Sequence, residues 1–237
     1  MLQAVLFDLD GTLLKIRDTD FMQGYFELIS QAVAPIVEPK LFLKALMESA
    51  KAMVLDNTEK TNAQVFWQCF RAYLPDCHET LASRLDLFYA NEYKGLSSLA
   101  TPSLLGRQIV QTALDKGLRI VLATNPLFPG VALYERMAWA NIADLPWELI
   151  TTYENMHYSK PHPEYYLEIA DKLQLSPQDC LMVGNDVPND IEAPSSLGMR
   201  TALTTDFLIN PQQVDYCKLV DWHGTAQELK EWLSTIY

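Results

Sequence analysis

Long apolar runs are missing from this 237-residue sequence, and none approaches the roughly 20 residues that a helix needs to cross a bilayer. The hydrophobic fraction of 49% is that of an ordinary folded protein, which excludes a disordered chain. The first residues lack the basic region of a signal peptide, and Asp8 interrupts their apolar stretch. We therefore expect a folded protein with no membrane partner.

Cysteine is also scarce, with four residues that lie far apart in the chain: Cys69, Cys77, Cys180 and Cys217. No two of them form a C-x-x-C pair, so a zinc site or a disulfide framework is disfavoured. Isolated thiols of this kind are typical of a reducing compartment. The cysteine pattern therefore predicts a cytoplasmic protein.

Positive charge is the third deficit, since 18 Lys and Arg stand against 30 Asp and Glu, for a formal net charge of −12. The sequence contains no basic run longer than a pair, which argues against nucleic acid or an anionic membrane as a partner. An anionic small molecule can still bind if a cation lies in the site. Most of the acidic residues are expected to serve solubility.

Short, β-branched apolar runs recur along the chain and read as buried strands. They cover Val5–Leu9, Ile120–Ala123, Leu149–Thr152, Leu181–Val183 and Thr201–Thr204. Segments of helix length lie between or after the later runs, at Leu104–Lys116, Val131–Asn141, Glu164–Leu173 and Ala226–Ile236. This alternation predicts an α/β fold with a doubly wound parallel sheet.

The first crossover is anomalous, because strand one ends near Asp10 and the next strand opens near Leu118. A complete βαβ unit needs only about 30 residues, so a segment has been inserted. Its periodicity is helical from Asp18 to Asn91, which predicts a smaller all-helical domain of about four helices. We assign residues 17–95 to this cap and residues 1–16 and 96–237 to the α/β core, with linkers at Leu14–Arg17 and Gly95–Pro102.

Two carboxylates, Asp8 and Asp10, follow the first strand in the run Asp-Leu-Asp-Gly-Thr, and Gly11 lets the backbone turn sharply after them. A polar strand end with a turn is the simplest interpretation of such a pair. The chemical interpretation is that one Asp attacks an electrophile while the other exchanges a proton with the leaving group.

Three further polar groups end apolar runs or lie in stiff loops: Thr124 with Asn125, Lys160 between prolines, and the acidic stretch from Asn185 to Asp190. Each is unremarkable by itself, as a strand cap, an exposed lysine or a helix N-cap. In a parallel sheet, however, the carboxyl ends of the strands share one crevice. Carboxylates meeting there repel one another unless a hard cation such as Mg²⁺ neutralises them, and the added hydroxyl, amide and ammonium suit a phosphoryl group.

This constellation resembles the haloacid dehalogenase superfamily, in particular its phosphatase branch with a helical cap inserted after the first strand. The motifs occur in the family's order, from Asp8 through Thr124 and Lys160 to Asp186. The resemblance implies a Mg²⁺-dependent phosphatase acting on a small phosphorylated metabolite through an aspartyl-phosphate. It assigns Asp8 as nucleophile, Asp10 as general acid and base, and Thr124 and Lys160 as holders of the phosphoryl oxygens.

The same resemblance implies a set of substrate and metal contacts. We expect substrate to be contacted by Gly11, Asn125, Lys160 and Arg17, and Mg²⁺ by Asp8, the Asp10 carbonyl, Asp186, Asn185 and Asp190. Asn185 departs from the pattern, because many members carry Asp directly after the glycine. Either the motif has shifted by one residue to Asp186 or the amide oxygen of Asn185 joins the metal shell. Pro194 is a second departure, since it should break or kink the helix expected after Asp190.

Several alternatives stay open at this point. A phosphomutase would use the same residues and differ only in the acceptor of the phosphoryl group. A dehalogenase would leave Asp10 without a leaving group to protonate, and a phosphonate hydrolase would depend on a linker lysine, for which Lys15 is the candidate. A signalling receiver domain or a catalytically silent phosphate-binding protein represents a different class, and the inserted cap argues against the receiver.

Overall fold

A six-stranded parallel sheet forms the centre of the computed structural model, which describes residues 1–236. Its strands, in chain order, are β1 (Ala4–Phe7), β2 (Arg119–Leu122), β3 (Leu149–Ile150), β4 (Cys180–Gly184), β5 (Arg200–Thr204) and β6 (Trp222–Gly224). They lie in the order β3-β2-β1-β4-β5-β6, and every neighbouring pair is parallel. β1 and β4 are central and buried along their whole length, as expected for a sheet covered on both faces.

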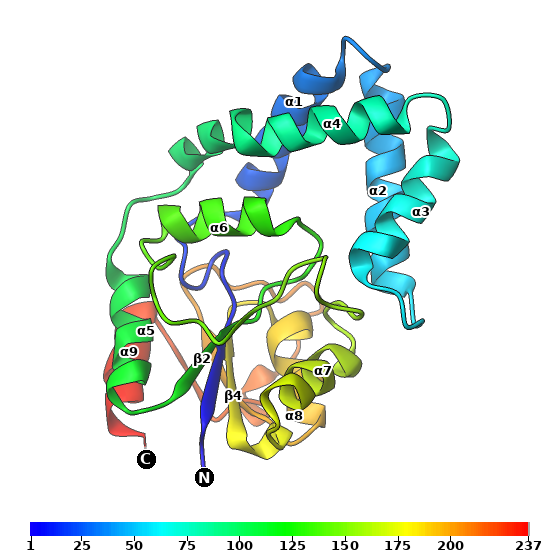
Figure 1. Ribbon diagram of the computed structural model, residues 1–237. Helices are drawn as coiled ribbons and strands as arrows, with labels where there is room; N and C mark the ends of the chain where they lie inside the picture. Colours follow the sequence, from blue (N-terminus) through cyan, green and yellow to red (C-terminus); the bar gives the residue numbers. More distant parts are fainter. Residues whose placement is uncertain (237) are drawn as a thin grey trace.

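Helices cover both faces of this sheet (Figure 1). α5 (Leu105–Asp115) packs with α9 (Ala226–Thr235) on one face, and α7 (Pro163–Leu173) packs with the short α8 (Ala193–Ser196) on the other. Val5 and Phe7 belong to the apolar cluster of the first face, whereas Ala4 and Leu6 belong to that of the second. This alternation along β1 is the period of two of a strand. The predicted doubly wound α/β fold is confirmed.

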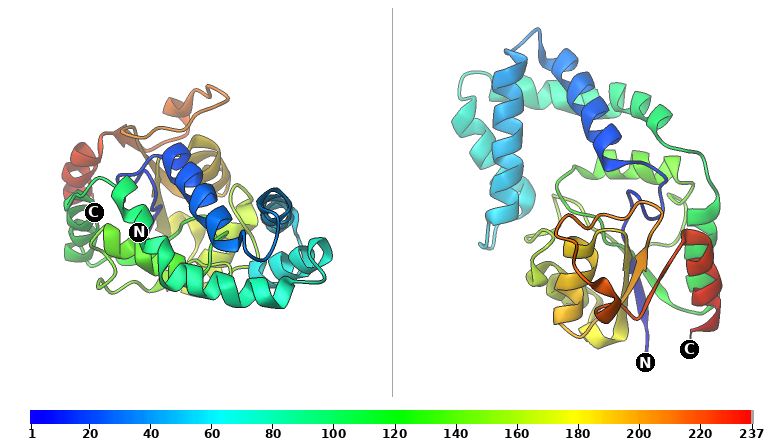
Figure 2. Two further views of the ribbon diagram at one scale, coloured as in Figure 1. Left: turned by 90° about the horizontal axis from the view of Figure 1, so that it is seen from above. Right: turned by 180° about the vertical axis from the view of Figure 1, so that it is seen from behind.

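The segment between β1 and β2 forms four α-helices, as its periodicity predicts. They are α1 (Asp18–Val33), α2 (Pro39–Leu55), α3 (Asn62–Tyr73) and α4 (His78–Ala90), followed by a 3₁₀ helix, η1 (Glu92–Leu99). This cap arches over the carboxyl ends of the strands, and its α2–α3 hairpin reaches down beside the core (Figure 2). The segment predicted as the second linker is helical as far as Leu99, because Tyr93 and Leu96 of η1 are buried.

α6 (Gly130–Trp139) lies between the sheet and the cap (Figure 1). The apolar cores of the cap and the sheet form one continuous cluster, which includes Phe21 and Tyr25 of α1 and Leu133 of α6. The two connections between cap and core run side by side, with the Thr101 N–H donating to the Lys15 carbonyl at 2.8 Å. The cap therefore rests on α6 as well as on its connections.

The remaining elements are short, and the sequence pattern did not predict them. They are η2 (Pro177–Asp179), a π-helical turn η3 (Val187–Glu192), η4 (Tyr216–Lys218) and the edge strand β6. Pro194 stands in the first turn of α8, so the expected break falls between η3 and this four-residue helix. Within residues 1–236, no helix is both long enough and apolar enough to cross a bilayer.

Candidate active site

The turn after β1 presents Asp8 and Asp10 at the edge of the sheet that faces the cap. The Asp8 N–H donates to the Val183 carbonyl of β4 at 2.9 Å, which extends the strand pairing by one residue. Gly11 then adopts φ +78°, and a Cβ at this position would lie 2.6 Å from Nδ2 of Asn185. The glycine is therefore required both by the left-handed backbone and by the close approach of Asn185.

Lys160 joins Asp8 to the acidic stretch after β4. Its side chain is 2% exposed, and its Nζ lies 2.9 Å from Asp8 Oδ1 and 2.6 Å from Asp190 Oδ1. Burial by itself would lower the pKa of Lys160, but the carboxylates of Asp190 and Asp8 raise this pKa well above its ordinary value. The lysine is therefore a permanent cation beside Asp8, and the simple alternative of an exposed lysine is wrong.

Both oxygens of the Asp190 carboxylate accept hydrogen bonds. Its Oδ1 accepts from Lys160, and its Oδ2 accepts from the backbone N–H groups of Asn185 and Asp186, at 3.1 Å each. The carboxyl group packs against Gly184, where a Cβ would lie 2.1 Å from Asp190 Oδ2. These contacts place Asp190 behind Lys160 and the Asn185–Asp186 backbone, which it positions.

Asn185 and Asp186 have different surroundings. Asn185 is buried, its Oδ1 accepts from the Thr12 hydroxyl at 3.0 Å, and its Nδ2 donates to the Phe207 carbonyl at 2.7 Å. Asp186 is partly exposed, and its two oxygens accept from the N–H and the side-chain amide of Asn189, at 3.1 and 2.8 Å. Both atoms of the Asn185 amide thus brace neighbouring loops, whereas Asp186 stays open to solvent. Thr12, which also lies 3.3 Å from Asp8 Oδ2, was not singled out from the sequence.

Asp10 forms an ion pair with Arg136 of α6, a residue that sequence reasoning missed. Burial and the neighbouring Asp8 raise the pKa of Asp10, while Arg136 opposes that rise. Arg136 is only 2% exposed, because it lies on the inner face of α6 beside Leu133 and Met137. A basic residue at i+3 from a core leucine is a signal that could have drawn attention to it.

The structure brings Thr124 and Asn125 to the end of β2, in register with the turn after β1 through the Ala123 N–H and the Phe7 carbonyl. Thr124 is 5% exposed, and Oδ1 of Asn125 is buried with no hydrogen-bond partner within residues 1–236. Arg17, by contrast, is exposed, and its guanidinium lies 5.9 Å from the ring centroid of Phe207. The expected contact of Arg17 with substrate stays a prediction.

A surplus of carboxylates surrounds this site. Asp18, the first residue of α1, is exposed on one side, and desolvation of its carboxylate on the other side, followed by the charges of Asp10, Asp8 and Asp186, raises its pKa to about 7. Such mutual repulsion is what a hard cation relieves, and the donors are all oxygens. Among the described residues, no cluster of three or more His, Cys, Asp or Glu side chains is close enough to hold a metal. Magnesium, which binds through one or two carboxylates plus carbonyl, phosphate and water oxygens, fits this donor set.

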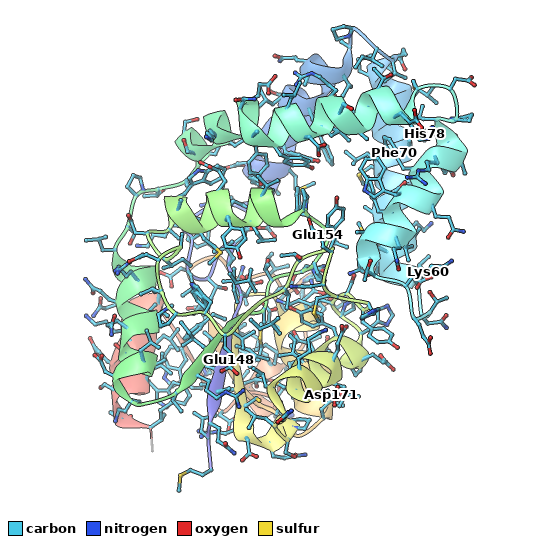
Figure 3. All side chains as sticks on the ribbon, viewed as in Figure 1. Lys60, Phe70, His78, Glu148, Glu154 and Asp171 are labelled. Carbon is cyan, nitrogen blue, oxygen red and sulfur yellow. The ribbon has the colours of Figure 1, made fainter. Side chains whose placement is uncertain are left out.

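A cavity of about 180 Å³ lies between the cap and the loop after β2. Its walls are mainly apolar and aromatic, and they include Phe26, Phe66 and Trp67 of the cap and Phe128 of the core. Figure 3 labels Lys60 at the lower end of the cap and Glu154 on the core loop that faces α3. The cavity adjoins the site through Phe128, which packs against the Arg136 guanidinium.

The two histidines near Lys160 have structural contacts. His157 Nδ1 lies 2.7 Å from Glu168 Oε1, and His162 Nε2 lies 2.7 Å from the Val54 carbonyl of the cap.

This chain was compared with family models, with curated proteins and with solved structures. A family model described as haloacid dehalogenase-like hydrolase matches residues 2–198. The chain is 27% identical over 216 residues to the N-acetylmuramic acid 6-phosphate phosphatase of Pseudomonas putida, covering 89% of this chain and 86% of that protein. It is 23% identical to the phosphoglycolate phosphatase of Xylella fastidiosa, covering 83% and 77%.

The solved structures that resemble this chain share its fold. A haloacid dehalogenase family phosphatase from Thermococcus onnurineus superposes with a TM-score of 0.59 at 16% identity, covering 98% of both chains. The L-2-haloacid dehalogenase of Xanthobacter autotrophicus superposes with a TM-score of 0.58 at 15% identity, covering 100% of both chains. With a family model that matches most of its length and a carboxylate pair at the end of β1, this chain belongs to the haloacid dehalogenase-like hydrolases.

Proposed function

We propose that this protein is a phosphatase that hydrolyses a small phosphorylated metabolite through an aspartyl-phosphate on Asp8. The observation that carries the proposal is the contact between Asp8 Oδ1 and the buried Lys160 Nζ, at 2.9 Å, with Asp10 two residues further along the turn. The prediction of a hydrolase in this family is confirmed, and the curated relatives at this level of similarity are named as phosphatases.

In the first proposed step, a carboxylate oxygen of Asp8 attacks the phosphorus and the ester P–O bond breaks. The leaving oxygen takes a proton from Asp10, which lies two residues further along the turn. In the second step, water attacks the phosphorus and transfers a proton to Asp10, releasing orthophosphate and restoring the Asp8 carboxylate. Lys160, Thr124 and the amide of Asn125 hold the phosphoryl oxygens during both steps.

Phosphatases of this family generally use Mg²⁺, and we propose that the oxygens of Asp8, the Asp10 carbonyl and Asp186 would hold it here. The ion would supply positive charge to the phosphoryl oxygens and relieve the repulsion among the carboxylates. Asp190 would act behind these groups, because it is 1% exposed and its oxygens face Lys160 and the Asn185–Asp186 backbone. Asn185 would brace Thr12 and the Phe207 loop.

We further propose that residues 17–95 act as a cap over a core formed by residues 1–16 and 96–237. Closing the site in this way excludes water from the attack of Asp8 and leaves the apolar cavity for the non-phosphate part of the substrate. The four cysteines are free thiols, which supports a cytoplasmic location.

The test is release of orthophosphate from p-nitrophenyl phosphate, with Mg²⁺ and after its removal by EDTA. We expect activity that depends on Mg²⁺ and that is abolished in a folded Asp8→Asn variant, because an amide cannot attack phosphorus. Asp115→Asn, which removes a carboxylate from the end of α5, is the matched control and should behave as wild type. Substantial activity in Asp8→Asn would exclude the covalent route. Phosphoryl transfer to a second sugar hydroxyl without orthophosphate release would instead identify a phosphomutase.

A further inference from the structure

Arg136 is held between the cap and the core in a way that its ion pair with Asp10 does not explain. Its guanidinium carbon lies 5.1 Å from the ring centroid of Phe21 in α1 and 4.7 Å from that of Phe128 in the loop after β2. These two aromatic rings fix the plane of the guanidinium, since cations favour the faces of aromatic rings. The side chain is therefore oriented by one residue of the cap and one of the core.

Only one edge of this guanidinium is used. Nη1 donates to Oδ2 of Asp10, while Nε and Nη2 are buried and have no hydrogen-bond partner in the described part of the chain. Asp10 Oδ1 and the hydroxyl of Tyr93 are likewise buried without a partner there. An unpaired buried polar atom is destabilising, and folded proteins leave few of them. Several such atoms around Arg136 point to a polar ligand that would pair with them.

The geometry of the free edge limits what this ligand can be. Nε–H and Nη2–H of arginine point in parallel, and this pair of donors matches the two oxygens of a carboxylate or of a phosphate. The scissile phosphoryl group has its own cation, because Lys160 Nζ lies beside Asp8. Arg136 lies instead beside Asp10, the residue that we place at the leaving oxygen.

We propose that Arg136 is a specificity residue that binds a second anionic oxygen group, carried by the leaving group a few bonds from the phosphoester. This proposal rests on the phosphatase function proposed above and defines its substrate class as phosphorylated acids in preference to phosphorylated polyols. Binding of this anionic group depends on the cap, because the Phe21 ring contacts the Arg136 guanidinium only when α1 lies over the core.

A role limited to holding Asp10 in place is the competing explanation, and it makes a different prediction. Loss of Arg136 would then slow all substrates equally, since each of them needs Asp10. If Arg136 also binds the substrate, its loss slows an anionic substrate much more than a neutral analogue of the same size.

The experiment compares 2-phosphoglycolate with 2-hydroxyethyl phosphate, two esters of similar size that differ by one carboxylate. For the wild-type protein with Mg²⁺, we expect kcat/KM at least about 10-fold higher for the acid, the effect of one charge-assisted hydrogen bond or more. Arg136→Gln should reduce this ratio by roughly 10- to 100-fold, mainly through KM for 2-phosphoglycolate. Arg136→Lys should retain only part of the preference, because a lysine cannot form the paired contact.

Arg107→Gln is the matched control, since Arg107 forms a bidentate ion pair with Asp144 at the surface of the core. It should leave both kcat/KM values unchanged. Equal losses on both esters in Arg136→Gln would overturn the proposal in favour of simple positioning of Asp10. Equal kcat/KM values for the two esters in the wild-type protein would also overturn the proposal. This second test does not depend on whether a variant folds. If the wild type hydrolyses neither these esters nor p-nitrophenyl phosphate, the proposed phosphatase function itself fails.

Discussion

Asn62 of the cap donates its side-chain amide to Oγ of Ser159 in the core, at 3.1 Å, one residue before Lys160. The same amide lies 3.2 Å from the Pro126 carbonyl, and the Asn62 N–H donates to the Met156 carbonyl at 2.8 Å. Asn62 is fully buried by these contacts. The cap is therefore attached to the core at the loop that positions Lys160, in addition to α6 and its two connections.

This attachment predicts the effect of removing the Asn62 amide. Asn62→Ala should lower the free energy of unfolding by about 1–3 kcal/mol, because it leaves buried oxygens of the core without a donor. Hydrogen exchange in residues 153–159 should speed up by about 10-fold or more, since 1.4 kcal/mol corresponds to a factor of ten. Asn57→Ala, at an exposed position of the loop that precedes α3, is the control. Unchanged exchange in a folded Asn62→Ala protein would show that the loop is held without the cap.

The sequence predicted the sheet and its site because those features depend on local patterns. The apolar runs identified β1, β2, β3, β4 and β5 to within about two residues at each end, since buried strands need continuous apolar side chains. The parallel topology then placed Asp8, Thr124 and Lys160 at one edge without further information. Asp190 likewise lies one helical turn after Asp186, with its N–H donating to the Asp186 carbonyl at 2.7 Å.

The remaining features depend on contacts between distant parts of the chain. β6 is a three-residue edge strand, only partly buried, so it has little apolar pattern to detect. Arg136 becomes part of the site because the fold brings α6 to the turn after β1, and Thr12 contacts Asn185 because the loop after β4 approaches that turn. The substrate contact expected for Arg17 stays a prediction, and its guanidinium lies 5.9 Å from the ring centroid of Phe207.

The assignment of the metal ligand after β4 can be tested with two variants. Asp186→Ala should raise the Mg²⁺ concentration needed for half-maximal activity by roughly 10- to 100-fold, because it removes a carboxylate from the cluster. Asn185→Ala should raise it less, because both amide atoms of Asn185 already pair with Thr12 and Phe207. Titration of activity against Mg²⁺ measures both shifts. A larger shift in Asn185→Ala would assign the metal position to the amide oxygen.

Gly11 and Gly117 offer a matched pair for the turn after β1. Both adopt a positive φ, +78° and +74°, but a Cβ at Gly117 would meet no atom within 4 Å, whereas at Gly11 it would meet Asn185. Each change to alanine carries the cost of a left-handed backbone, about 1–2 kcal/mol, or roughly 2–8 °C in Tm. Gly117→Ala should therefore lose stability and keep its activity, while Gly11→Ala should lose both. Equal activity of the two variants in p-nitrophenyl phosphate hydrolysis would contradict the role of the Gly11–Asn185 approach.

The carboxylate cluster predicts a pH-dependent stability in the metal-free protein. With a pKa of about 7 in the folded protein and an ordinary value of 3.8, Asp18 holds more protons folded than unfolded between these pH values. Stability therefore falls as pH rises through this window, and the loss is complete above pH 7. Asp18→Asn removes this loss, so the variant should melt at a higher temperature than wild type at pH 8 and at the same temperature near pH 4. Solvent screening at the exposed side of Asp18 reduces the size of the effect and leaves its sign unchanged.

Magnesium provides the second half of this test. A cation among Asp8, Asp10 and Asp186 offsets the repulsion that raises the pKa of Asp18, so adding Mg²⁺ at pH 8 should shrink the difference in Tm between Asp18→Asn and wild type. Asp20→Asn removes a carboxylate from the same turn of α1 and controls for the loss of negative charge at the helix N-terminus. Melting curves at pH 4, 6 and 8, with and without Mg²⁺, measure the effect. A wild-type protein that is more stable than Asp18→Asn at pH 8 without metal would show that the carboxylates do not share one repulsive site.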